Sequence, residues 1–296
     1  MSRQPVGSRQ GPVSPKVAGA ATVVVLLWAS AFVAVDIALE STTPGQLALA
    51  RYVVASIVFL AVAIWRRMAR PPVRDLLRFA LAGGIGIALY NLALNTGQET
   101  VRPGVASLLI NTVPIWTLLL ARLVLGERMT PRGLLGSGVA FAGVAIIGLA
   151  EGDWGGFEAG VASILAAAVA QALYFVIVKP MLERYHPVEL TAWAVWFGCL
   201  FLLPFRRGLL AALQHCSSAA LGSILFLGVG PAAIAYMAWS YVLGELPAGQ
   251  ASSVLFLIPV VAIALGWLVL GDVPEPVALA GGSLAVIGVL LGRETA

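Results

Sequence analysis

About ten apolar runs of roughly twenty residues follow one another along the chain, separated by short polar segments. A helix of that length spans the hydrocarbon core of a bilayer and satisfies its own backbone hydrogen bonds there. We therefore predict an all-α integral membrane protein with ten transmembrane helices. Their predicted bounds are 17–39, 46–65, 76–95, 104–125, 133–150, 157–178, 188–205, 219–242, 248–270 and 276–292. Residues 1–16, rich in Pro, Gly, Ser and Arg, are expected to form a disordered cytoplasmic tail.

Composition excludes most soluble classes. Hydrophobic residues make up 60% of the chain and charged residues only 11%, and the mean hydropathy is +0.95. A soluble protein of this length needs more charge to cover its surface. The two cysteines and two histidines, Cys199, Cys216, His186 and His215, are scattered and form no catalytic or metal-binding pattern. We predict no cofactor and no metal site, and a net charge of +4 points to cytoplasmic loops rather than to nucleic acid.

The basic residues set the predicted orientation. Arginine clusters follow the second and fourth spans, at 66–78 and 122–132. The acids at 151–158 lie in a loop on the other side of the membrane. Lys and Arg are enriched in cytoplasmic loops of membrane proteins. Both termini are therefore expected in the cytoplasm of a bacterium, with the protein in its inner membrane. The long loop at 206–218, which contains Arg206 and Arg207, is expected to lie flat on the outer surface.

The second half of the chain repeats the first, with matching positions about 145 residues apart. Matches between Leu and Ala arise by chance in such a chain, but matches between glycines, prolines and acids do not. These pairs include Gly104 and Gly249, Ser107 and Ser252, Pro114 and Pro259, and Glu127 and Asp272. We predict a first five-helix repeat over 17–150 and a second over 151–293. Because five is odd, the second repeat must be inverted in the membrane, as in many secondary transporters.

Three segments carry a family resemblance. They are WASAFVA at 28–34, the pair Arg51-Tyr52, and TVPIWTLLLARLVLGERMTPRGLLGSGVAFAGVAIIG at 112–148. With them the chain resembles the drug/metabolite transporter superfamily, in its EamA-type ten-helix branch. The segment LYNLALNTGQETVRPGVASLLINT at 89–112 is similar to the YddG-type exporters of aromatic and other amino acids. The resemblance implies a central cavity lined by spans one, three, four, six, eight and nine, with five and ten packed behind. Asp36 and Asp272 depart from the family pattern, so the substrate does not follow from it.

Polar and aromatic side chains within the spans predict a substrate site, since such residues are costly in lipid unless they face protein or a cavity. Together they suggest a wide, uncharged cavity that suits a zwitterion with an apolar side chain or an aromatic solute. Helix packing and, for aromatic residues near span ends, anchoring at the membrane interface are the alternatives. The predicted substrate-binding residues are Trp28, Tyr90, Asn91, Asn95, Ser107, Asn111, Gln171, Tyr174, Tyr236, Trp239 and Ser240.

Two prolines and two charged residues complete the prediction. Pro114 and Pro259 occupy equivalent mid-span positions, where proline removes a helical hydrogen bond, and we predict that they act as hinges. Arg51 lies within the second span, and we interpret it as structural, either reaching toward the interface or pairing with an acid such as Asp36. For the glycine-rich fifth and tenth spans we expect close helix packing.

These features predict an exporter of small metabolites, in particular neutral or aromatic amino acids, that works by alternating access. Multidrug efflux of cationic aromatics is the alternative and would depend on Asp36. An intramembrane enzyme would need a nucleophile with a nearby base, and a receptor would not need an inverted repeat. The expected partners are a small-molecule substrate and the lipid bilayer. A monomer already contains both repeats, and a homodimer through spans five and ten stays open.

Overall fold

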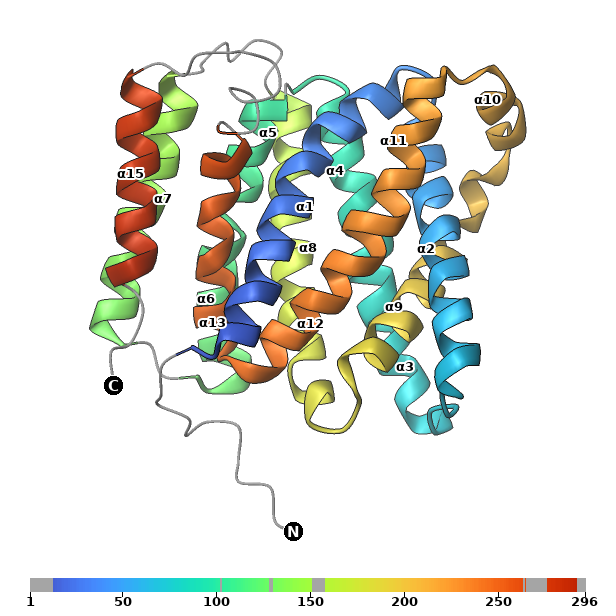
Figure 1. Cartoon of the computed structure of the whole chain (residues 1–296), viewed down its shortest axis with the longest axis horizontal. Coiled ribbons are helices and arrows are strands. Elements are labelled where there is room, and N and C mark those ends of the chain that lie inside the picture. Colours follow the sequence, from blue (N-terminus) through green and yellow to red (C-terminus); the bar gives the residue numbers. More distant parts are fainter. Residues whose placement is uncertain are drawn as a thin grey trace.

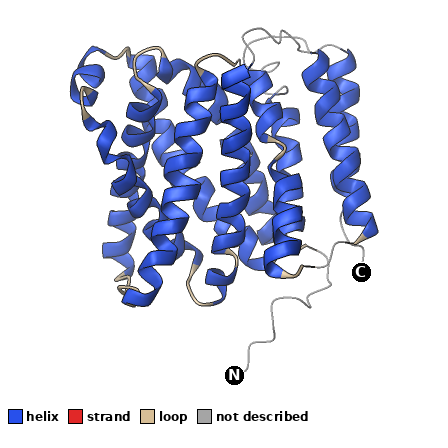
Figure 2. Ribbon diagram, turned by 180° about the vertical axis from the view of Figure 1, so that it is seen from behind, coloured by secondary structure: helices blue, strands red, loops and turns tan. Residues whose placement is uncertain are grey.

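The computed structural model describes residues 13–101, 103–127, 130–150, 158–262, 264 and 276–291. Throughout this part the chain forms helices and loops and contains no strand (Figures 1 and 2). The all-α prediction is confirmed. The predicted tail up to residue 12, the last third of the ninth span and Asp272 lie outside the described residues.

The helices of the first half are α1 (Pro15–Leu39), α2 (Pro44–Arg66), α3 (Val73–Ala82), η1 (Gly83–Leu89), α4 (Tyr90–Gln98), α5 (Pro103–Ile110), α6 (Val113–Leu120), η2 (Ala121–Leu125) and α7 (Pro131–Ala150). Those of the second half are α8 (Glu158–Val178), η3 (Pro180–Glu183), α9 (Pro187–Leu202), η4 (Leu203–Arg206), α10 (Leu209–His215), α11 (Ser218–Val229), η5 (Gly230–Ala235), α12 (Tyr236–Glu245), α13 (Ala248–Ser253), η6 (Val254–Leu257) and α15 (Pro276–Leu291). Among the described residues, 7 helical stretches are long and apolar enough to cross a membrane, and three shorter apolar helices accompany them. The count of ten spans stays a prediction.

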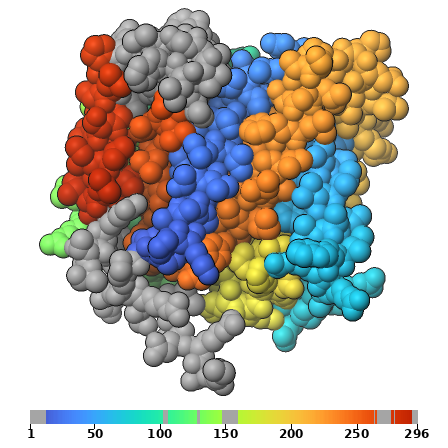
Figure 3. Space-filling model, viewed as in Figure 1, coloured from blue at the N-terminus to red at the C-terminus, as the bar shows by residue number. Residues whose placement is uncertain are grey.

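Large apolar side chains on the outside of the bundle support a membrane setting. Leu26, Ile57, Leu60, Ile64 and Leu200 are all exposed. In water such a surface would favour aggregation, whereas lipid tails cover it without cost. Figure 3 shows one face of the bundle, on which α1 lies between α11 on one side and the segment around α13 on the other.

Local sequence signals explain where several helices begin. Thr43 accepts from the backbone N–H of Gln46, whose side chain accepts from Thr43 in return, and Pro44 takes the first helical position of α2. His186 and Glu189 make the equivalent reciprocal cap at the start of α9. These caps satisfy N–H groups that have no partner within the helix.

Four of the predicted continuous spans are interrupted in the structure. Residues 111–112 form a turn between α5 and α6, directly before Pro114, which cannot donate to the carbonyl of Ile110. Similarly, the 3₁₀ segment η6 precedes Pro259. The third and eighth spans contain the π-helical segments η1 and η5, each followed by a tyrosine, Tyr90 or Tyr236. Such π-helical turns are frequent at functional sites.

The helices α7 and α15 pack tightly against each other at one edge of the molecule (Figure 1). A Cβ atom added to Gly143 would lie 2.4 Å from the backbone nitrogen of Ala285, and one added to Gly288 would lie 2.2 Å from that of Ala140. Only glycine permits so close an approach of two backbones. The expected close packing of these glycine-rich helices is therefore present.

Two polar contacts tie helices together at the end of the bundle predicted to be cytoplasmic. The carboxylate of Glu127, just after η2, accepts hydrogen bonds from the backbone N–H groups of Ala248 (2.8 Å) and Gly249 (3.2 Å) at the start of α13. The Nζ atom of Lys179, just after α8, donates to the carbonyls of Leu243 (2.6 Å) and Leu246 at the end of α12. Each contact therefore joins the end of the fourth or sixth span to a helix end of the eighth or ninth span.

A buried carboxylate anchors the same end of the bundle elsewhere. Asp75, at the start of α3, is 2% exposed. It accepts from both terminal nitrogens of Arg184, at 3.2 and 2.8 Å, and from the hydroxyl of Tyr185 at 2.6 Å. Because the arginine is bidentate, this contact fixes the loop after η3 against α3. On the opposite side of the bundle, the predicted surface loop contains the short helix α10, which lies at the periphery beside α11 (Figure 1).

Candidate functional site

A cavity lies at the centre of the helical bundle. Its wall is formed by residues of α1, α2, α4, α5, α8 and α12, together with the segments on either side of the proline interruptions. The centres of water molecules can occupy a volume of about 50 Å³ within it, and this is room for about three to five waters. All six spans that the family resemblance implied contribute to this wall. The second span also contributes, through Arg51.

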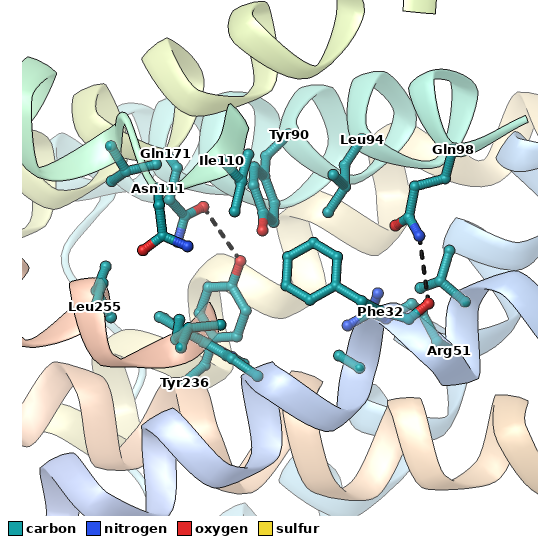
Figure 4. A pocket seen from close by; sticks show the side chains of 15 residues that line it. Phe32, Arg51, Tyr90, Leu94, Gln98, Ile110, Asn111, Gln171, Tyr236 and Leu255 are labelled. Carbon is teal, nitrogen blue, oxygen red and sulfur yellow. Dashed lines mark hydrogen bonds between the residues drawn. The ribbon is translucent and has the colours of Figure 1, made fainter. Parts of the chain in front are cut away.

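The cavity has two polar ends separated by an apolar middle (Figure 4). Asn111, Gln171 and Tyr236 gather at one end, and Arg51 and Gln98 at the other. The middle of the wall is formed by aromatic and aliphatic side chains, namely Phe32, Tyr90, Leu94 and Ile110. A ligand with two polar groups joined by an apolar portion matches this order.

The end formed by Asn111, Gln171 and Tyr236 is an amide and hydroxyl cluster. The hydroxyl of Tyr236 lies 3.4 Å from Oε1 of Gln171 and 3.3 Å from the carbonyl oxygen of Gly86. Nδ2 of Asn111 donates to the carbonyl of Ser107 at 2.6 Å, and its Oδ1 has no hydrogen-bond partner among the described residues. Asn111 directly follows α5, so the interruption before Pro114 places its side chain at the cavity wall.

The other end of the cavity carries its charge. Arg51 is 4% exposed, and its Nε has no hydrogen-bond partner in the part of the chain that the structure describes. Its guanidinium carbon lies 5.4 Å from the centre of the Tyr52 ring. Gln98, the last residue of α4, donates from Nε2 to the carbonyl of Phe32 at 3.3 Å and keeps Oε1 without a partner.

Aromatic rings of α1, α8 and α12 pack together next to the Tyr236 end of the cavity. The ring of Trp28 lies 5.4 Å from that of Tyr236 and 5.7 Å from that of Trp239. The ring centres of Phe175 and Trp239 are 4.5 Å apart, and those of Tyr174 and Tyr236 are 5.8 Å apart. The indole N–H of Trp28 donates to the carbonyl of Pro231 at 3.3 Å, in η5. These contacts join α1, α8 and α12 below the cavity.

The structure divides the predicted substrate-binding residues into two groups. Trp28, Tyr90, Asn111, Gln171 and Tyr236 line the cavity. The remaining predicted residues lie outside its wall and are buried between helices: Asn91, Asn95, Ser107, Tyr174, Trp239 and Ser240.

Hydrogen bonds between helices account for three residues of the second group. Asn91 donates to the hydroxyl of Tyr52 at 2.9 Å, and Asn95 donates to the carbonyl of Pro44 at 3.0 Å. Ser240 and Thr191 are 2.8 Å apart through their hydroxyls. Polar side chains commonly join membrane helices in this way. Sequence spacing placed Asn91 and Asn95 on one face of the helix, but that face packs against α2.

The sequence interpretation of Arg51 needs correction. Asp36, its proposed partner, is exposed, whereas Arg51 is buried at the cavity. The cavity is therefore not wholly uncharged. Gln98 and Phe32 were also missed, although Gln98 continues the spacing of Asn91 and Asn95 by less than one helical turn. The best available signal was Arg51 itself, since a charged residue within a span is a site candidate by default.

Comparison with known proteins identifies the family. The EamA-like transporter family matches residues 16–149 and again residues 158–292. The chain belongs to this family. It is therefore a multi-pass membrane transporter and not an enzyme, as predicted.

Several relatives share nearly the whole length of this transporter. It is 38% identical over 276 residues to a probable terminal-alkyne amino-acid exporter of Streptantibioticus cattleyicolor, covering 93% of both chains. It is 35% identical to the uncharacterized transporter YdfC of Bacillus subtilis, covering 89% of this chain and 86% of that one. It is 28% identical to the uncharacterized inner membrane transporter YedA of Escherichia coli K12, covering 88% and 89%.

A solved structure supports the fold independently. A protein crystal structure with 18% sequence identity has a TM-score of 0.74 and covers 94% of this chain and 98% of its own. At that identity the likeness shows a shared fold and nothing of the substrate.

Proposed function

We propose that this transporter exports neutral or aromatic amino acids from a bacterial cytoplasm across the inner membrane by alternating access. The observation that carries the proposal is the order of the cavity wall, which is polar at both ends and apolar between them. An amino acid with an apolar side chain can place its two charged groups at one polar end and its side chain against the apolar middle. The relative named a probable terminal-alkyne amino-acid exporter supports this class of substrate.

The two family matches support the proposed two-repeat architecture. They cover 16–149 and 158–292, close to the repeats at 17–150 and 151–293 predicted from sequence. With both termini in the cytoplasm, the Arg51 end of the cavity faces the outer side. The aromatic rings below the cavity, and the contacts of Glu127 and Lys179, then close the cytoplasmic side. Alternating access requires the walls of the cavity to move during transport, with Pro114 and Pro259 as the proposed hinges.

The alternative of cation efflux has less support from the site. None of the described residues that line the cavity is acidic, and Arg51 gives its wall a positive charge. A cationic drug would meet repulsion there. The proposed amino-acid substrates are uncharged overall and carry a carboxylate.

Counterflow into liposomes tests the proposal. The purified protein is reconstituted with an excess of unlabelled amino acid inside, and uptake of labelled neutral, aromatic, basic and acidic amino acids is followed. We expect saturable uptake of neutral or aromatic amino acids that is strongly reduced in Asn111→Ala, because that side chain lies on the cavity wall.

Ser283→Ala serves as the matched control, because Ser283 is an exposed polar residue of α15 whose hydroxyl bonds only within its own helix. Uptake of a cationic dye in the absence of any amino-acid uptake would refute the proposal and favour drug efflux.

A further inference from the structure

The cavity contains a buried cation whose charge nothing in the described residues neutralises. Arg51 is 4% exposed, its Nε is unpaired, and no acidic side chain of the described residues lines the cavity. Arginine does not lose its proton under physiological conditions. The charge is therefore permanent, and among the described residues the Tyr52 ring, whose centre lies 5.4 Å from the guanidinium carbon, offsets part of its desolvation.

A permanent buried positive charge of this kind is stabilised by a bound anion. An uncompensated charge in a low-dielectric interior is strongly unfavourable, and its partner is usually a carboxylate or phosphate held by several hydrogen bonds. Because Arg51 lies on the wall of the cavity, the anion can come from the ligand. We propose that Arg51 binds the carboxylate of the transported substrate, and that the ligand class is α-amino acids and related carboxylates with apolar tails. This inference rests on the proposed function for the amino-acid part of the class.

Gln98 supplies the second half of a zwitterion site. Its Nε2 is occupied by the carbonyl of Phe32, which leaves Oε1 as an unpaired acceptor at the same end of the cavity as Arg51 (Figure 4). In an α-amino acid the ammonium and carboxylate groups are attached to the same carbon atom, so one end of a ligand can reach both residues. Arg51 then receives the carboxylate, and Oε1 of Gln98 accepts a hydrogen bond from the ammonium group.

The rest of the cavity fits the remainder of such a ligand. Phe32, Leu94 and Ile110 provide the apolar surface for the side chain, beyond the head group. The unpaired Oδ1 of Asn111 lies at the far end, where it meets the tip of a longer side chain. Specificity for the class therefore resides at the Arg51 end, and selection among side chains resides at the Asn111 end.

A comparison of an amino acid with its amide tests the carboxylate contact. In wild-type liposomes we expect unlabelled leucine to inhibit uptake of labelled substrate more strongly than leucinamide, by roughly ten- to a hundredfold, because a hydrogen-bonded charge pair is lost with the amide. In Arg51→Gln this preference should collapse to near one. Arg51→Lys should keep part of it, and Arg66→Gln, which removes an exposed charge from the same helix, should keep all of it.

A binding measurement separates this inference from the proposed function. Hexanoate should raise the melting temperature of the detergent-solubilised wild type and of Arg66→Gln but not of Arg51→Gln, whereas hexanamide should raise none. If no amino acid is transported but hexanoate stabilisation depends on Arg51, the proposed function fails and the carboxylate site stands. If the wild type transports leucine but is inhibited as strongly by leucinamide as by leucine, the inference is overturned, whether or not Arg51→Gln folds.

Discussion

The contact of Glu127 with the start of α13 predicts a measurable change in local opening at the cytoplasmic end. Its two carboxylate oxygens accept from the backbone N–H groups of Ala248 and Gly249, at 2.8 and 3.2 Å. Removal of a helix cap costs ~1 kcal/mol and loss of a carboxylate at a helix start up to ~1 kcal/mol more. Glu127→Ala should therefore lower the free energy of local opening at the start of α13 by ~2 kcal/mol, which corresponds to roughly a thirtyfold larger population of the locally opened state.

Hydrogen exchange at the same amides provides the assay. Peptides that cover 246–253 should exchange about thirtyfold faster in Glu127→Ala than in the wild type, because exchange reports the population of locally opened states. Glu127→Gln should fall between them, since its amide retains one acceptor oxygen without the charge. Glu183→Gln is the matched control, an exposed acid on the same side of the molecule.

Unchanged or non-specific exchange would refute the role assigned to Glu127. Unchanged exchange of 246–253 in Glu127→Ala, in a protein whose other peptides exchange as in the wild type, means that Glu127 does not hold the start of α13. Faster exchange in Glu183→Gln of the same size would instead assign the effect to net charge at this end.

Three further perturbations follow from the packing. Gly143→Ala should lower the melting temperature, because its Cβ would lie 2.4 Å from the backbone of α15 and overpacking costs ~1–3 kcal/mol. Gly138→Ala should leave the melting temperature unchanged, because its Cβ would meet nothing within 4 Å, and equal melting temperatures of the two variants would contradict this reasoning. Asp75→Asn should lower the melting temperature by roughly 2–4 °C after allowance for solvent screening. Arg78→Gln should have almost no effect, because the Arg78 side chain is 61% exposed and its terminal nitrogen lies 3.9 Å from the Asp75 carboxylate. Pro114→Ala should slow counterflow without changing the half-saturating substrate concentration, if the interruption before it is a hinge; an unchanged rate argues that the proline only shapes the cavity.

The general architecture could be predicted from sequence because membrane solvation leaves few choices. Apolar runs of a fixed length give helices, and basic loops give a predicted orientation. The helical positions of most spans differ from the predictions by a few residues. What periodicity could not reveal was the internal irregularity of the spans, such as η1 and η5, since a π-helical turn leaves no distinct mark on an apolar run.

The site was predicted only in part, for a physical reason. Polar residues on a membrane helix serve both cavities and helix contacts, and one sequence does not tell which neighbour faces them. Asn111 and Gln171 proved to face the cavity, whereas Asn91 faces Tyr52. Arg51 was assigned a structural role because its long side chain could reach the membrane interface or pair with an acid such as Asp36. The structure instead places it at the cavity wall, with its Nε lacking a partner among the described residues.

The glycine contacts of α7 with α15 have a consequence for biosynthesis. Proteins fold in the order in which they leave the ribosome, N-terminal parts first. The face of α7 around Ala140 and Gly143 meets residues of α15, which are synthesised much later than α7. During insertion this face must therefore remain covered by lipid or by an insertion factor until 276–291 arrives. Helix α15 thus completes the first half of the molecule as well as the second, so a chain truncated before α15 should be recognised as unfinished by membrane quality control.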